Sequence, residues 1–440
     1  MLKSYSVIRS FGLVLAFSSC GWKSPHLVCA LILFSSCSGG DSSSSGIAVT
    51  TAPSAPSSLS LVTPQGSPGS NPTPTISVSG GGVLRGNTVR LFSDPACATL
   101  EIGSAVSSGT SVSITVNSAL AFSLHTIYAN ATNVIGTSPC SSSSVSYKIL
   151  DCPSGFIPVG HNMDVGTTSD FCVMKYEAKA LNTDTSVIDT DGCNEPGCTT
   201  ANWGLANHIP ESSPTGSPWR RINPINASAE CNSLNTGGAT NYDLISNPEW
   251  MTIARNAESV SSNFEASVMA RGWAAKSSNP FRPDPWTNLA VASSTDASCL
   301  YNTGADTCAS SGDHLYKRTL VLSNSEEIWD FSGNVWEWVD WNASIPSFQE
   351  GPKTCAASWV EFPVAAFYEC LSGLADQVFP ANSNGSSVEA FGLFYGGPNG
   401  AAMRGGDWDD GSYVGAFALY LGSSTTHASA NRGFRCVYRP

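Results

Sequence analysis

Short runs of alternating apolar and polar residues fill the chain between residues 58 and 150, and turn-forming Gly, Ser and Pro residues separate them. Alternation with a period of two is typical of strands that bury one face. Several short strands in series predict a β-sandwich. The expected strands are Ser58–Val62, Thr75–Val78, Thr88–Phe92, Ser111–Val116, Ser123–Ala129 and Val145–Leu150.

After residue 150 the pattern changes to loops, short strands and two helical segments. The first expected helix is Ala227–Asn235. The second is expected to begin with Asn247 as its N-cap, Pro248 at the first helical position and Glu249 in the first turn. Its apolar positions fall three and four residues apart, which is the spacing of one helix face.

Two apolar runs lie near the N-terminus, and each is too short to span a bilayer as an ordinary helix. Both end in Phe-Ser-Ser-Cys, at Cys20 and Cys37, which resembles a bacterial lipoprotein signal. Cys37 is the preferred lipidation site because a flexible Ser/Gly tract follows it at once. The resemblance implies a lipid-anchored protein of the bacterial cell envelope, in the outer membrane, periplasmic or surface-exposed. A plain cleaved secretory peptide is the alternative.

Composition narrows the class of protein. The chain is 41% hydrophobic and only 12% charged, which suits loop-rich β structure. Its net charge of −13 argues against nucleic-acid partners. Fifteen cysteines indicate an oxidising compartment.

The segment Gly333–Trp338 reads G-N-V-W-E-W and resembles the signature of the formylglycine-generating-enzyme-like domains, also called the sulfatase-modifying-factor family. Further segments resemble that family in the expected order: Phe171–Glu177, Leu244–Arg255, and Arg404–Trp408 followed by Asn431–Cys436. The resemblance covers about residues 152–440 and implies an α+β C-type-lectin-like fold. The earlier β-rich segment resembles a bacterial immunoglobulin-like module.

The expected domains follow from these patterns. They are a lipoprotein signal peptide at 1–37, a Ser/Thr/Pro-rich tether at 38–57, an all-β immunoglobulin-like sandwich at 58–150 and the formylglycine-generating-enzyme-like, lectin-like domain at 151–440.

Twelve cysteines remain after the three of the signal region, and an even number favours disulfides, although sequence does not fix their connectivity. Proximity favours the pairs Cys97–Cys140, Cys152–Cys172, Cys193–Cys198, Cys299–Cys308 and Cys355–Cys370. The family resemblance implies a bridge from the first helix to the last strand, which would join the remaining Cys231 and Cys436.

The same resemblance implies copper(I) chemistry only where two cysteines follow the R-G-G-S-W motif. The corresponding positions here are Asp410 and Gly415, and no cysteine lies between Arg404 and Arg435. Because soft thiolates suit copper(I), we expect neither this metal site nor its oxidase chemistry. Iron-dependent relatives need a histidine cluster, and the six histidines are scattered; His314 and His427 stay candidates.

The tryptophan-rich run around Gly333 also suggests a structural calcium site. Trp336 and Trp338 should anchor a core, and a carboxylate between them needs a cation or several hydrogen bonds. The resemblance implies Ca²⁺ ligation, the alternative being a dry turn whose carboxylates accept backbone N–H bonds. Its ligands would be the Asp330 side chain with the carbonyls of Phe331, Gly333 and Val335, and Glu337 nearby. The segment Asp189–Asn194 resembles a calcium loop, but it lacks the following Glu, so we expect a plain turn.

Aromatic, polar and small residues mix without a clear period in the segment Asp407–Tyr420. It resembles the hypervariable ligand face of lectin-fold proteins diversified by retroelements. The alternative is that its aromatic residues belong to the core and its aspartates are simply solvated. The candidate ligand-binding residues are Trp408, Asp409, Asp410, Ser412, Tyr413 and Tyr420.

Together these patterns predict an exported lipoprotein whose catalytically silent domain binds a protein or glycan, with the lipid as its only membrane contact and no nucleic-acid partner. One alternative is a formylglycine-generating-type or non-haem iron oxidoreductase with an atypical metal site. Another is a structural component of the envelope.

Overall fold

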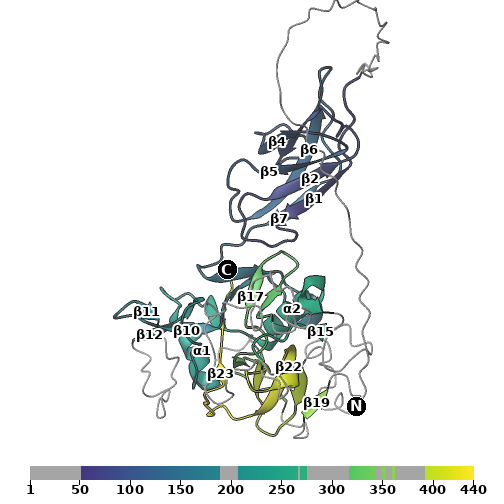
Figure 1. Ribbon diagram of the computed structural model, residues 1–440. Coiled ribbons are helices and arrows are strands. Elements are labelled where there is room, and N and C mark those ends of the chain that lie inside the picture. The colour runs from purple at the N-terminus through teal and green to yellow at the C-terminus, as the bar shows by residue number, and fades with distance from the viewer. Residues whose placement is uncertain are drawn as a thin grey trace, which may run out of the picture. The chain divides into compact units, whose positions relative to one another are not determined.

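The computed structural model describes residues 51–188, 207–265, 268–274, 317–342, 348–352, 359–361 and 392–440. They form a mostly β structure with few helices (Figure 1). No helix among them is both long and apolar enough to cross a bilayer. The predicted signal peptide with Cys37 and the segment Asp189–Asn194 lie outside the described residues.

Residues 58–150 form two antiparallel sheets that enclose one apolar core. Alternate residues of their strands, such as Ile76, Val89 and Ile127, are fully buried and pack in one cluster. The six predicted strands are confirmed, and a seventh was missed because its sequence, G-S-A-V, shows no apolar alternation. One sheet has the order β1 (Ser58–Thr63), β2 (Thr75–Ser79), β5 (Ser111–Thr115), and the other β4 (Gly103–Val106), β3 (Thr88–Phe92), β6 (Leu124–Thr132), β7 (Val145–Lys148). The immunoglobulin-like assignment stays a prediction.

The C-terminal part of the chain is built around a six-stranded sheet that brings distant motifs together. The G-N-V-W-E-W strand pairs antiparallel with the R-G-G strand through Glu337 and Arg404. It also pairs parallel with the start of the N-R-G-F-R-C segment through Trp336 and Arg432. The sheet has the order β19 (Trp359–Glu361), β20 (Leu393–Tyr395), β22 (Gly415–Ser423), β21 (Ala401–Gly405), β18 (Trp336–Val339), β23 (Arg432–Gly433).

Smaller sheets complete this domain. The last strand of the chain pairs on one side with the strand that follows the first helix and on the other with the F-C-V-M strand. The first and last motifs of the family resemblance are therefore neighbours in one sheet. That four-stranded sheet has the order β13 (Tyr242–Leu244), β24 (Cys436–Tyr438), β9 (Phe171–Met174), β8 (Phe156–Val159). The others are β11 (Val187–Ile188), β10 (Ala178–Asn182), β12 (His208–Ser212); β14 (Phe264–Glu265), β15 (Val268–Met269); and β16 (Thr319–Val321), β17 (Glu327–Trp329).

Both predicted helices exist, but each begins one to three residues away from the expected position. Helix α1 spans Pro224–Ser233. Helix α2 spans Asn247–Glu258, and its N-cap is Ser246 rather than Asn247. Ser246 Oγ accepts a bond from the Glu249 N–H, and Glu249 accepts one from the Ser246 N–H in return, a reciprocal cap that satisfies two otherwise unpaired donors. Short 3-10 turns lie at Met163–Val165 (η1), Ser261–Asn263 (η2) and Gly411–Tyr413 (η7).

Two buried indoles tie helix α2 and the segment before α1 to the six-stranded sheet. Trp250 of α2 stacks on Phe331 with ring centroids 3.8 Å apart and donates its indole N–H to the Ala416 carbonyl at 2.7 Å. Trp338 of β18 is fully buried and donates to the Ile222 carbonyl at 2.8 Å. Large apolar area with a satisfied polar atom is the arrangement that makes tryptophan a good core anchor.

Three predicted disulfides are confirmed: Cys97–Cys140, Cys152–Cys172 and Cys231–Cys436. The third joins α1 to β24 across a sequence separation of 205 residues, as the family resemblance implied. The other cysteines assigned to pairs, Cys193, Cys198, Cys299, Cys308, Cys355 and Cys370, lie outside the described residues.

Candidate functional site

Strand β18 alternates two buried indoles with a buried carboxylate. Glu337 is 1% exposed, and of the two expected alternatives, a cation or several hydrogen bonds, the structure has a cation, Arg435. Arg435 Nε lies 2.6 Å from Glu337 Oε2, and Nη2 bonds the other carboxylate oxygen. Such a two-pronged pair neutralises both charges and fixes the geometry of the guanidinium.

Glu337 and Arg435 belong to a cluster of six buried ionisable side chains, three acidic and three basic. Asp330 accepts two bonds from Arg318, at 2.5 and 2.6 Å. Lys179 Nζ lies 3.6 Å from a Glu177 oxygen. All six side chains are at most 2% exposed: Glu177, Lys179, Arg318, Asp330, Glu337 and Arg435. Burial, with the nearby Asp330 charge, raises the pKa of Glu177 to about 8.

This cluster holds the turn in which calcium was predicted. Glu177 accepts bonds from the Asn334 amide at 2.5 Å and from the Val335 N–H at 3.3 Å. Both proposed acidic ligands, Asp330 and Glu337, have their oxygens engaged by arginines. A hard cation needs several oxygens directed at it, so the side chains present do not fit a calcium site. Arg318 and Arg435 supply positive charge beside the two predicted acidic ligands, and calcium at this turn stays a prediction.

The R-G-G segment fixes the start of a loop at residues 406–414. Arg404 is fully buried, donates two bonds to Asn247 Oδ1 at 2.6 and 3.0 Å and one to the Phe417 carbonyl at 2.9 Å. Burial lowers the pKa of Arg404 to about 9. Gly405 and Gly406 have φ of 91° and 84°, and a Cβ on Gly406 would lie 2.9 Å from Val414, so this sharp exit requires glycine.

Two carboxyl groups organise the 406–414 loop from inside. Asp407 is 3% exposed; it accepts a bond from the Asp409 N–H at 2.7 Å and one from the Asn431 amide at 2.5 Å. Its own N–H donates to Asp410 Oδ2 at 3.0 Å, and the Trp336 indole N–H also bonds Asp410. Burial, with the Asp410 charge beside it, raises the pKa of Asp407 to about 8. Burial likewise raises the pKa of Asp410.

Aromatic rings lie beside this carboxyl pair. Tyr420 of β22 stacks on Tyr395 of β20, with centroids 4.5 Å apart and planes 8° from parallel. The Trp336 ring is 5.9 Å from Tyr420. Arg432 is 8% exposed and lies over the Trp338 ring at 5.5 Å. Within the described part of the chain, Arg432 Nε and Nη1 have no hydrogen-bond partner, so the site contains a buried cation with unused donors.

The predicted ligand residues fall into two groups. Asp410 and Tyr420 meet at Trp336, inside the site. On the loop itself, Asp409 is exposed, Tyr413 is 41% exposed, and Trp408 is half-buried with its N–H bonded to the Asn334 carbonyl. The side chain of Ser412 is not described. Sequence reasoning did not assign Asp407, Tyr395, Asn431, Arg432 and Trp336 to this site, although the order of the motifs could have brought Asn431 and Arg432 to β18.

The site does not supply soft metal ligands. Asp410 and Gly415 stand where the family resemblance implies the two copper cysteines. Among the residues that the structure describes, no group of three or more His, Cys, Asp or Glu side chains is placed to hold a metal ion. His427 is exposed, and His314 lies outside the described residues. Carboxylate oxygens already bonded to an indole and to backbone N–H groups are poor donors for copper(I).

The comparisons with solved structures give only weak similarities. A Treponema denticola variable protein 1 is 14% identical, with 65% of this chain and 95% of that chain covered and a TM-score of 0.26. A biofilm associated protein BSP domain is 19% identical, with 22% of this chain covered and a TM-score of 0.16; the chain spans only 15% of its length. The comparison with curated proteins finds no match.

The comparison with family models is decisive for the C-terminal domain. The sulfatase-modifying factor enzyme 1-like domain matches residues 160–440, which is more than half of the chain. The matched range includes the paired motif strands β9, β18, β21, β23 and β24. The chain therefore belongs to the sulfatase-modifying factor enzyme 1-like family.

Proposed function

We propose that this protein is an exported, lipid-tethered member of the family whose C-terminal domain is catalytically silent and binds a protein ligand. The binding surface would consist of the 406–414 loop with the neighbouring rings of Tyr395 and Tyr420. The observation that carries the proposal is Asp410, which stands where the family resemblance puts a copper thiolate and is bonded to Trp336.

Several features of the loop support a protein ligand. Tyr413 is 41% exposed, Asp409 is exposed, and Trp408 is half-buried. Tyrosine and tryptophan are enriched at protein interfaces because they offer large contact area at a low entropic cost. The loop is also held from below by Asp407 and Asn431, so a partner would meet a preformed surface.

The proposed absence of oxidase activity is argued from the side chains at the site. Copper(I) needs soft donors, and the site offers carboxylates, a guanidinium and aromatic rings. A glycine at position 415 offers no side chain at all. If the protein were instead an oxidase with unfamiliar ligands, purified protein would contain copper or iron and consume O₂ with thiol peptides. We expect neither result.

Capture experiments test the binding role. The full exported chain, immobilised, is incubated with solubilised envelope proteins, and captured partners are quantified by mass spectrometry. Tyr413→Ser should weaken capture by about thirtyfold if this residue is a hot spot. The matched control is Tyr128→Ser in strand β6 of the N-terminal module, which should capture as the wild type does.

Other results would redirect or overturn the proposal. Equal capture by the Tyr413→Ser and Tyr128→Ser variants would refute the loop surface. Binding on a glycan array that depends on Tyr413 would replace the protein ligand with a glycan. Flat responses in both assays, with a leaky envelope in a deletion strain, would favour the structural role.

The tether is tested separately. Cys37→Ser should abolish labelling of the protein with a radioactive fatty acid and release it from the membrane fraction, because one anchor without a spanning helix gives the only membrane attachment we predict. Unchanged labelling of the Cys37→Ser variant together with loss in Cys20→Ser would move the anchor to Cys20.

A further inference from the structure

A cavity of about 660 Å³ lies in the C-terminal domain and shares no residue with the 406–414 loop. It is formed where the loop before β9, the start of α2, the residues after β18 and the end of the chain meet. Its volume is in the range of about 300–1,000 Å³ that holds small-molecule ligands. The lining residues used below are Thr168, Ser169, Glu249, Trp341 and Arg439.

Trp341 supplies a rigid apolar face. A Cβ atom added to Gly351 would lie 2.9 Å from the Trp341 ring, so the indole packs directly on the Gly351 backbone. The ring also packs against the main apolar core. The backbone N–H of Trp341 donates to the Gln349 carbonyl at 3.1 Å. The indole is only partly buried and lines the cavity, so it is held from one side while it remains accessible to a ligand.

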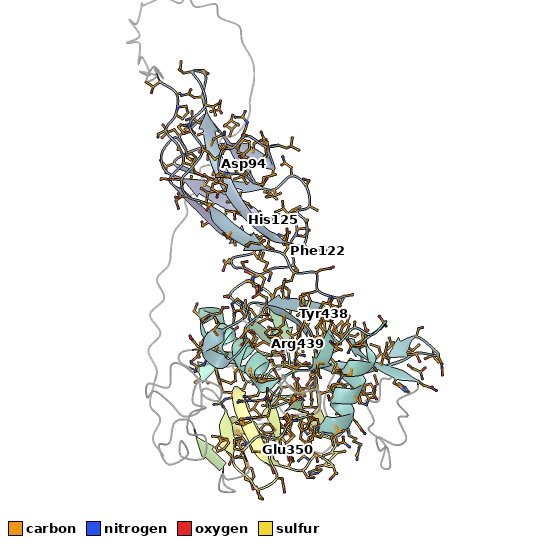
Figure 2. The ribbon with its side chains drawn as sticks, turned by 180° about the vertical axis from the view of Figure 1, so that it is seen from behind. Asp94, Phe122, His125, Glu350, Tyr438 and Arg439 are labelled. Carbon is orange, nitrogen blue, oxygen red and sulfur yellow. A yellow bond between two sulfur atoms is a disulfide. The ribbon has the colours of Figure 1, made fainter. Side chains whose placement is uncertain are left out.

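Hydrogen-bonding groups line the same cavity. Thr168 and Ser169 are exposed, and within the described residues neither hydroxyl has a hydrogen-bond partner. Arg439 donates from Nε and Nη2 to Glu249, at 2.7 and 2.9 Å, and from Nη1 to Asp243 at 3.2 Å. A guanidinium has five N–H donors, so two of those on Arg439 remain for a ligand. Figure 2 labels Arg439 next to Tyr438 at the end of β24.

The charged side chains at the cavity are already paired with one another. The Arg439 guanidinium is shared between the carboxylates of Glu249 and Asp243, and these carboxylates raise the pKa of Arg439. Asp170, which also lines the cavity, is paired with Lys148 and His161. An anion would have to compete with two carboxylates for one arginine, and a cation would have to compete with that arginine. The geometry therefore favours an uncharged polar ligand.

We propose that this cavity binds an uncharged saccharide residue. A pyranose ring has a face of C–H groups that can lie on the Trp341 indole and a rim of hydroxyls that both donate and accept. The free hydroxyls of Thr168 and Ser169 match that rim in both roles, and the two remaining Arg439 donors match sugar oxygens. The site goes beyond the protein-binding surface proposed above and does not depend on it.

Saturation-transfer NMR and titration calorimetry on the full chain, with its disulfides intact, test the proposal. The probes are glucose, galactose, mannose and N-acetylglucosamine, with glucuronic acid and glucosamine as charged comparators. We expect at least one neutral sugar to bind with a Kd on the order of 1 mM, as for a shallow site with few contacts. Binding of only the charged sugars, or of none of the six, would overturn the proposal.

Variants assign the binding to this cavity. Trp341→Ala should abolish saturation transfer, and the double variant Thr168→Val/Ser169→Ala should weaken binding by about five- to tenfold, since each lost hydrogen bond of an exposed hydroxyl costs about two- to threefold. Tyr128→Ala removes an aromatic ring from strand β6, outside both proposed sites, and is the matched control with unchanged sugar binding. If Trp341→Ala does not fold, as judged by circular dichroism, the double variant decides, because its two residues are exposed. Wild-type affinity in the double variant would refute the site.

Discussion

Replacing Arg435 with methionine tests whether the buried charge cluster holds the fold. Arg435 is fully buried and pairs with both oxygens of Glu337. It also donates to the carbonyls of Met174, Trp329 and Asp330, at 3.1, 3.2 and 3.3 Å. Methionine keeps the approximate length of the side chain and removes all of these bonds at once.

The size of the effect follows from the carboxylate that is left behind. Without a cation, buried Glu337 would take up a proton, and holding a group of ordinary pKa of about 4.3 protonated at pH 7 costs about 4 kcal/mol. This agrees with the cost of about 3–5 kcal/mol for breaking a buried ion pair. The cost should fall to about 1 kcal/mol at pH 5, because protonation is then nearly free.

Tryptophan fluorescence during urea unfolding measures this change. No tryptophan lies between residues 58 and 150, so the signal does not come from the N-terminal sandwich. Arg435→Met should lower the free energy of unfolding by about 4 kcal/mol at pH 7, and the added change Glu337→Gln should recover about half of the loss. Arg90→Met, which breaks a one-third exposed pair with Glu101, is the control with an expected cost of about 0–1 kcal/mol.

Two outcomes would refute this reasoning. A loss below about 1 kcal/mol at pH 7 would mean that Arg435 does not neutralise Glu337 in solution. A loss that is equal at pH 5 and pH 7 would mean that the cost comes from packing or from the lost carbonyl bonds instead of the unpaired carboxylate.

Three further predictions concern other features of the domain. Replacing Cys231 and Cys436 with alanine should lower the free energy of unfolding by about 2–5 kcal/mol, measured by urea unfolding, because their bridge closes a long loop. Asp407→Asn should raise the Tm relative to the wild type, by an amount that grows between pH 5 and pH 8. The pKa of Asp407 in the folded state, about 8, lies above its unfolded value, so the wild type loses stability over this range as the pH rises. A difference in Tm that does not change with pH would contradict this reasoning. Adding 5 mM Ca²⁺ or a chelator, roughly saturating and depleting weak calcium sites, should leave the Tm of the wild type unchanged, and a rise of several degrees with Ca²⁺ would restore the calcium site at Asp330.

Sequence was a good guide wherever a feature depends on residues close together in the chain or on a motif of the family. The six strands of the sandwich follow from local alternation, and the Cys231–Cys436 bridge follows from the family resemblance. Its two tryptophan neighbours showed that Glu337 needs a cation or several hydrogen bonds. The identity of the partner was not clear from them, because Arg435 is 98 residues away and reaches Glu337 only through the pairing of distant strands.

The candidate site shows the same limit. Asp410 and Tyr420 were assigned because they lie within one unusual segment, whereas Tyr395 and Arg432 come from other strands and carry no local signal. The N-cap of α2 was misplaced by one residue because both Ser and Asn are good caps. The Asn247 side chain does not cap the helix, because its oxygen accepts two bonds from Arg404 instead.

The cluster of six buried ionisable side chains has a consequence for the conditions that the protein can tolerate. Mobile ions weaken attractions between charges that face water, but they cannot enter a dry interior. Salt therefore weakens the attractions among these side chains, which are at most 2% exposed, much less than those at the surface. The contribution of this cluster to the free energy of unfolding should therefore change little between low and high salt.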